Sequence, residues 1–282
     1  MHSQALLKGP LGEIPITHAV VMGILNITPD SFFGGSRFTA LPDILKTAEH
    51  MLADGAMILD IGGQSSRPGS DRISAAEEWD RVAPVLEALR REFPKAWLSI
   101  DTYQADVAKK AIDAGIDIVN DISFGEDDER MFSVLADQNI TYIGMHKIGD
   151  PKHMQDHAHY SDVVSDVLHY LQDRVQKAQA AGIKHVWVDP GFGFAKTAKQ
   201  NFDLLRQLNR ISSEFPNLLA GISRKGMIYK TLGITADEAL NGTTFLHAEA
   251  LNKGAKILRV HDVKPALECI QLHNQLYPLN TN

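Results

Sequence analysis

The chain has 282 residues, a formal net charge of −7 and 44% hydrophobic residues. This acidic balance argues against binding to nucleic acids or acidic membranes, which requires a basic surface. No run of about 20 apolar residues is present, so we expect no membrane-spanning helix and, from the N-terminal segment, no secretory signal. The lone cysteine, Cys269, cannot form an internal disulfide, which fits a cytoplasmic protein.

Short apolar runs and amphipathic stretches alternate through the first half of the chain. Residues 4–18 have alternating character around a GPLG turn, which predicts a small β-hairpin before the main fold. The apolar runs are bounded by turn residues and are typical of buried parallel strands, whereas the stretches between them have helical periodicity. Strands are predicted over 21–27, 56–63, 97–101, 116–121 and 140–146, and helices over 42–54, 74–93, up to 115, up to 137, and 161–181.

The same alternation continues to the C-terminus. Further strands are predicted over 185–189, 217–225 and 255–262, and further helices over 202–215, 236–252 and 264–276. Eight strand–helix units in succession predict a (β/α)8 TIM barrel of the α/β class, with residues 1–282 as a single domain. In this fold active sites are built on the face where the carboxyl ends of all the strands meet.

Polar residues stand at the ends of most of these strands. In the segment 186–196, VWVDPGFGFAK, an apolar strand runs into Asp189, and Gly191 and Gly193 allow a sharp turn beside it. For one strand alone, an aspartate that caps the next helix is an equal alternative. Recurrence along the chain favours a shared site instead. The strand-end residues are Asn26, Asp60, Asp101, Asn120, Asp121, His146, Asp189, Arg259 and His261.

Cationic residues gather around the last two predicted strands. Arg259 and His261 alternate with Val260, so both point to the same side and could cradle a phosphate. A salt-bridged pair on the rim is the alternative. The triplet SRK at 223–225 would add positive charge, although such a triplet is often a helix start.

Two further residues extend this interpretation. Arg67 lies among small residues and could close over a bound anion, although a solvated arginine is the usual case. Asn26 could be a weak Mg²⁺ ligand that shares the ion with a substrate phosphate, or a satisfied buried amide. The sequence carries no dinucleotide fingerprint, no Gly-Lys-Ser/Thr phosphate loop and no H-E-x-x-H. Spacing alone therefore indicates a barrel enzyme or binder of a small phosphorylated molecule.

Seven motifs, in chain order, are similar to those of one family. MGILNITPDSF, LDIGGQSSRPGS, IDTY, NDIS, VDPGFGF, GISRKG and ILRVHDVK resemble dihydropteroate synthase, over essentially the whole chain from about residue 4. The resemblance implies a (β/α)8 barrel, usually a homodimer, that uses Mg²⁺ in cytoplasmic folate biosynthesis and is a target of sulfonamides. The implied reaction condenses 6-hydroxymethyl-7,8-dihydropterin pyrophosphate with p-aminobenzoate to give 7,8-dihydropteroate and pyrophosphate.

The resemblance also implies roles for the matching residues. The pterin pocket would comprise Asp101, Asn120, Asp189 and Lys225, because carboxylates accept N–H bonds from the amino-pyrimidine edge and a lysine donates to the ring carbonyl. The pyrophosphate and Mg²⁺ site would comprise Asn26, Arg67, Arg259 and His261. Aminobenzoate would contact Ser66, Phe194 and the stem of Lys225.

The implied mechanism needs no covalent nucleophile. Pyrophosphate leaves, a cationic methylene conjugated with the pterin remains, and the arylamine attacks it. Cations and Mg²⁺ stabilise the leaving group, and Asp101 offsets the developing positive charge. The implied catalytic residues are Asp101, Lys225, Arg259 and His261.

Five positions depart from the family pattern, mostly in loops expected to organise aminobenzoate. They are Gly34, Gln64, Ser66, Lys147 and Gly226, where the family usually has Asp, Glu, Thr, Met and Ser. Two alternatives therefore stay open: a paralogue that binds the pterin pyrophosphate but uses aminobenzoate poorly or takes another amine, and a methyltetrahydrofolate-binding barrel. SRKG and RVHDV argue against the second, because their cations suit an anionic leaving group.

Overall fold

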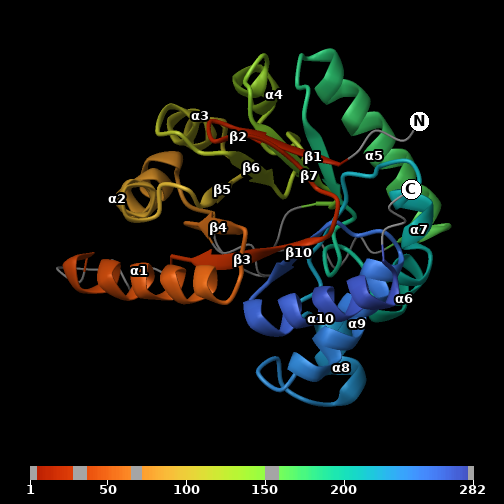
Figure 1. Cartoon of the computed structure of the whole chain (residues 1–282). Helices are drawn as coiled ribbons and strands as arrows, with labels where there is room; N and C mark the ends of the chain where they lie inside the picture. The colour runs from red at the N-terminus through yellow and green to blue at the C-terminus, as the bar shows by residue number, and fades with distance from the viewer. Residues whose placement is uncertain (1–4, 28–36, 65–71, 150–158, 279–282) are drawn as a thin grey trace.

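The computed structural model describes residues 5–27, 37–64, 72–149 and 159–278. Its main feature is an eight-stranded parallel sheet in the order β8-β7-β6-β5-β4-β3-β10-β9, and a bridge between Val188 and Leu218 joins the two ends of the sheet. The predicted (β/α)8 barrel is confirmed (Figure 1). Its strands are β3 (Val20–Asn26), β4 (Ile58–Gly62), β5 (Trp97–Asp101), β6 (Ile118–Asp121), β7 (Thr141–Met145), β8 (Val186–Asp189), β9 (Leu219–Ala220) and β10 (Ile257–Val260).

The helices form a ring outside these strands, as Figure 1 shows. Ser74 caps the start of the helix predicted over 74–93, since its hydroxyl accepts the backbone N–H of Glu77 at 3.2 Å. The helices are α1 (Arg37–Ala53), α2 (Ala75–Glu92), α3 (Ala105–Asp113), α4 (Met131–Leu135), α5 (Val163–Ala180), α6 (Ala198–Arg206), α7 (Leu208–Ser212), α8 (Gly226–Leu232), α9 (Leu240–Asn252) and α10 (Val263–Leu276).

The predicted N-terminal hairpin is also confirmed. Strands β1 (Leu6–Gly9) and β2 (Gly12–Pro15) pair antiparallel and lie across one end of the barrel (Figure 1). The Leu7 side chain is fully buried among residues at the amino ends of the barrel strands. The indole N–H of Trp187 donates to the carbonyl of Leu6 at 2.8 Å. The hairpin therefore closes the end of the barrel opposite to the expected active-site face.

The inside of the barrel changes from apolar to polar along the strands. Successive inward positions are two residues apart, because strand side chains alternate between the two faces. Near the amino ends these positions form one hydrophobic cluster: Met22, Ile58, Trp97, Ile118, Ile143, Trp187, Leu219 and Ile257. Two residues further along, the same strands present Ile24, Asp60, Ser99, Asn120, Met145, Asp189, Gly221 and Arg259. This switch concentrates the polar groups toward the carboxyl face.

The prediction of a strand over 217–225 was wrong in its length. The paired strand β9 covers only Leu219–Ala220, and helix α8 begins at Gly226. Between them Arg224 adopts a left-handed φ of 52°, where its guanidinium is held by Asp262 at 2.7 and 2.8 Å. An apolar run such as NLLAGI cannot reveal this early exit, because the tertiary ion pair that fixes the turn comes from another unit.

Candidate active site

Side chains from β4, β5 and β6 gather around the guanidinium of Arg259 and its partner Asp60. Its Nε donates to Asp60 Oδ2 at 2.6 Å, and its Nη2 donates to Asp101 Oδ2 at 2.7 Å. The Asn120 amide donates to the same Asp60 oxygen at 3.1 Å. Asp60 is fully buried, and Asn120 and Asp101 are 4% and 9% exposed. Such an ion-pair cluster is stable inside a protein only when its members satisfy one another.

Two carboxylates share this one guanidinium, so acceptor oxygens remain available to a ligand. Burial, opposed by Arg259 and assisted by the nearby Asp60, raises the pKa of Asp101 to about 7. The second oxygen of Asp60, Oδ1, is buried and has no hydrogen-bond partner among the described residues. A buried acceptor in this state favours a ligand that brings N–H donors.

Asp189 lies at the end of β8 and begins a tight turn. Its Oδ1 accepts the backbone N–H of Gly191 at 2.8 Å, and its side chain is 5% exposed. Gly191 has a φ of 72°, and a Cβ there would lie 1.9 Å from the carbonyl oxygen of His146. Only glycine fits this position. Burial raises the pKa of Asp189, while the positive charge of Lys225 lowers it.

Lys225 reaches over the same turn. Its ammonium donates to the carbonyl of Phe192 and lies 4.6 Å from the centre of the Phe194 ring. Burial lowers the pKa of Lys225 to about 8, although Asp189 opposes the shift. We name Asp60, Asp101, Asn120, Asp189, Lys225 and Arg259 the inner cluster. It offers acceptors and donors side by side, which suits a flat heterocycle with both N–H groups and a carbonyl.

His261, another predicted anion-binding residue, lies at the rim. His261 follows the end of β10, and its Nδ1 lies 3.0 Å from the Ser223 hydroxyl. It also lines a cavity of about 300 Å³ between α1 and the start of α10. The prediction that Arg224 adds positive charge to the pocket was wrong. Its guanidinium instead binds Asp262 and the carbonyls of Ala236 and Asp237.

The structure describes only some of the remaining predicted residues. Asn26 ends β3 beside the inner cluster, since a Cβ on Gly62 would lie 3.5 Å from its amide oxygen and 3.8 Å from Asp101 Oδ2. Gly226 is the first residue of α8. Gly34, Ser66 and Arg67 lie outside the described residues.

Sequence analysis missed three side chains of this site. Asp60 was identified as a strand end but given no role. Lys196 is 3% exposed and donates to the carbonyls of Gly191 and Phe194 and to His146 Nδ1, at 2.9, 3.1 and 2.9 Å. Asn201 accepts the N–H of Gly193 at 2.7 Å. Lys196 and Asn201 thus fix the turn that carries Phe194, and a lysine directly after VDPGFGFA was the available signal for the first.

In the described part of the chain, no helix is long and apolar enough to cross a membrane. The same residues contain no group of three or more His, Cys, Asp or Glu side chains able to hold a metal ion by themselves.

Comparison with known proteins agrees with this site. Residues 22–261 match the family described as "Pterin binding enzyme". That match covers the strands that carry the inner cluster. Fold and site together therefore define a pterin-binding barrel enzyme.

Comparison with individual relatives identifies a particular enzyme family within this class. A dihydropteroate synthase of Streptococcus pyogenes is 42% identical over 263 residues, which is 92% of this chain and 96% of the relative. The crystal structure of the Yersinia pestis dihydropteroate synthase with a sulfonamide drug complex has a TM-score of 0.88 and 37% identity, covering 96% of this chain and 98% of that one. The Xanthomonas albilineans dihydropteroate synthase with 4-aminobenzoic acid has a TM-score of 0.89 and 33% identity, covering 98% and 100%.

The chain belongs to the dihydropteroate synthase family. It is an enzyme of the transferase class, and its reaction is the condensation of 6-hydroxymethyl-7,8-dihydropterin pyrophosphate with p-aminobenzoate in folate biosynthesis.

Proposed function

We propose that the inner cluster binds the pterin ring and that Arg259 couples this ring to departure of the pyrophosphate. The observation that carries the proposal is the Asp60–Arg259–Asp101 bridge, with Asn120 on the same Asp60 oxygen. Asp101, Asn120 and Asp189 accept or exchange hydrogen bonds with the amino-pyrimidine edge, and the Lys225 ammonium donates to the ring carbonyl. Matched polar groups of this kind also reject rings that lack the same edge.

The pyrophosphate lies on the outer side of Arg259. In the described part of the chain Nε and Nη2 are held by Asp60 and Asp101, which leaves Nη1 to donate outward. His261 supplies a further donor from the rim, and Arg67 is predicted from the sequence to supply another. Loss of pyrophosphate leaves a cationic methylene conjugated with the pterin, and the carboxylate of Asp101 stabilises that positive charge.

Asn26 fits a Mg²⁺ ion that is shared with substrate. Its amide oxygen faces the same space as Asp101 Oδ2 above Gly62. Mg²⁺ commonly takes one or two protein oxygens and completes its shell with water and substrate phosphates, so a full protein cage is not required. The ion would neutralise the charge that develops on the pyrophosphate.

The arylamine enters over Phe194 and the stem of Lys225, and Ser66 is predicted from the sequence as a further contact. The Phe194 ring is held in place from below by the Lys225 ammonium, and the amides that begin the α8 region suit a carboxylate. p-Aminobenzoate attacks the methylene through its amine and gives dihydropteroate.

A coupled pyrophosphate-release assay, with and without p-aminobenzoate, tests this assignment. We expect release that requires both substrates and Mg²⁺, together with formation of dihydropteroate. Binding of the pterin substrate without dihydropteroate at any aminobenzoate concentration would instead support a paralogue that takes another amine. Asn26→Ala is expected to raise the Mg²⁺ concentration needed for half-maximal rate, and an unchanged requirement would remove Asn26 from the metal site.

We further infer a homodimer of single-domain subunits that works in the cytoplasm. Phe245 on α9 and Leu272 and Leu276 on α10 are 74%, 68% and 73% exposed, and these two helices pack against each other. Large exposed apolar side chains on two neighbouring helices favour a protein contact. Light scattering is expected to give twice the chain mass, and Phe245→Arg to shift it toward the monomer. The lone Cys269 supports a reducing compartment.

A further inference from the structure

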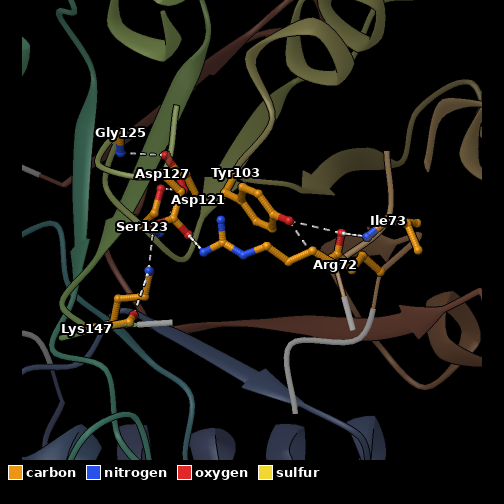
Figure 2. Close-up of polar contacts among 10 residues, drawn as sticks. Arg72, Ile73, Tyr103, Asp121, Ser123, Gly125, Asp127 and Lys147 are labelled. Atoms are coloured by element: carbon orange, nitrogen blue, oxygen red, sulfur yellow. Dashed lines mark hydrogen bonds and ion pairs between the residues drawn. The ribbon is translucent and has the colours of Figure 1, made fainter. Parts of the chain in front are cut away.

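A second polar network lies outside the inner cluster, and it joins loops from four strands. Lys147, after β7, donates to Asp127 Oδ1 at 2.9 Å, and Arg72 donates to Asp127 Oδ2 at 2.8 Å. The Arg72 guanidinium lies 4.9 Å from the centre of the Tyr103 ring. The Tyr103 hydroxyl bonds to the side-chain amide of Gln64 at 3.1 Å. Figure 2 shows Lys147, Asp127, Arg72 and Tyr103 following one another in this order.

We name these five side chains, Gln64, Arg72, Tyr103, Asp127 and Lys147, the rim network. Its centre is the Asp127 carboxylate, which is 13% exposed and lies between two cations. Lys147 is the buried partner at 4% exposure and also donates to the carbonyl of Gly149 at 3.0 Å. Arg72 is the outer partner at 43%. Loss of Asp127 would therefore leave a buried ammonium without its counter-ion.

The network ends on the Tyr103 ring, which lies in an apolar cluster beside Phe194. Tyr103 follows Asp101 by two residues and is 8% exposed. It forms a small apolar cluster with Ile122 and Met145, and Phe194 packs against this cluster. Because Phe194 also lies against Lys225, the Tyr103 ring belongs to the apolar wall above the inner cluster. Gln64 and Arg72 together fix the height and tilt of that ring.

We propose that Asp127 is a positioning residue that sets the affinity for the arylamine, by holding Arg72 and Lys147 so that the Tyr103 ring stays in the wall of the pocket. The proposal deepens the activity assigned above and rests on it. The pterin side is independent of the network, because the residues of the inner cluster hold one another. The arylamine is the substrate that enters at the rim and must lie flat against this wall.

The separation of two Michaelis constants tests the proposal. Asp127→Asn is expected to raise the KM for p-aminobenzoate about tenfold. The KM for the pterin pyrophosphate and kcat should stay within about twofold. A general loss of structure would move all three values together. Equal changes in both Michaelis constants, or an unchanged KM for p-aminobenzoate, would overturn the proposal.

A second variant separates the buried ammonium from the position of the ring. Asp127→Asn is expected to lower Tm by several degrees because Lys147 loses its carboxylate. Adding Lys147→Met removes the orphaned charge and should recover most of Tm, while the KM for p-aminobenzoate stays high because Arg72 is still released. Recovery of that KM together with Tm would show that Asp127 serves stability only.

Asp106→Asn is the matched control. Asp106 forms an exposed two-point ion pair with Arg130 at 3.0 and 3.1 Å on the same side of the barrel, outside the rim network. It should leave both Michaelis constants unchanged. If the wild type shows no turnover, the proposed activity fails. The comparison then proceeds on p-aminobenzoate affinity by calorimetry, in which an unweakened Asp127→Asn variant would overturn the network proposal as well.

Discussion

The inner cluster and the rim network are both chains of charged and hydrogen-bonded side chains, but they are built on different parts of the barrel. Asp60, Asn120 and Arg259 occupy inward strand positions, whose directions are fixed by the sheet. Arg72 and Asp127 lie on loops, and Arg72 is 43% exposed. A buried cluster on rigid strands suits the invariable part of a reaction, whereas a loop network can be adjusted without disturbing it.

The largest expected effect comes from breaking the inner cluster at its centre. Arg259→Met leaves the Asp60 and Asp101 carboxylates buried without their counter-ion, which should lower the free energy of unfolding by about 3–5 kcal/mol. Turnover should fall about a thousandfold. Urea denaturation and the pyrophosphate assay measure the two effects. Adding Asp60→Asn should restore part of the stability but none of the turnover; a double variant that regains activity would refute the role of Arg259.

Asp189→Ala tests the pterin side of the same cluster. Loss of a buried charged acceptor should weaken pterin binding about a hundredfold, because the ring N–H groups lose their partner. Asp189→Asn keeps the shape and one oxygen, so it should be intermediate. Calorimetric titration of the pterin measures both. An Asp189→Ala variant with wild-type affinity would place the residue outside the pocket.

These two variants concern residues that could be predicted from the sequence. Strand ends are visible as apolar runs that stop at a polar residue, and the barrel fold sends all such ends to one face, so the sequence predicts that Asp101, Asn120, Asp189 and Arg259 lie on that face. The pairing of Arg259 with Asp60 was not predicted. Asp60 and Arg259 are separated by 199 positions, and no local pattern specifies which carboxylate a buried arginine will meet.

The loop residues illustrate a different limit. Lys196 and Asn201 act on a turn only a few residues away. Lys196 donates to a backbone carbonyl and the Asn201 side-chain oxygen accepts a backbone N–H, and both backbone groups become available only in the folded turn. Asp127 and Lys147 depend on two loops lying side by side. Local propensity does not predict such contacts, because they depend on tertiary packing.

The pH dependence of kcat/KM for the pterin pyrophosphate gives a smaller effect. The pKa of Asp101, raised by burial to about 7, predicts falling activity below pH 7, since only the ionised carboxylate accepts N–H bonds on both oxygens and stabilises the cationic methylene. The pKa of Lys225, lowered by burial to about 8, predicts falling activity above pH 8. Each limb should approach tenfold per pH unit.

The contribution of Asp101 to folding stability should change with pH in the direction opposite to that of activity. Because folding raises the pKa of Asp101 above its ordinary value of 3.8, the stability contributed by its protonated form is full below about pH 4 and is lost as the pH rises through about 7. Asp101→Asn should remove the acid limb of activity. An acid limb that persists in this variant would assign it to another group, such as Lys196, whose pKa burial lowers to about 7.

The smallest effect is expected at the far end of the rim network. Tyr103→Phe removes the hydroxyl that bonds to Gln64, but the ring remains under the Arg72 guanidinium. One partly exposed hydrogen bond contributes about 0.5–1.5 kcal/mol, so the KM for p-aminobenzoate should rise about threefold, with no change in the KM for the pterin pyrophosphate. Steady-state kinetics with each substrate varied measures this difference. If Tyr103→Phe raised the KM for the pterin pyrophosphate instead, the ring would belong to the inner cluster. The proposed separation between a fixed pterin pocket and an adjustable rim would then be wrong at Tyr103.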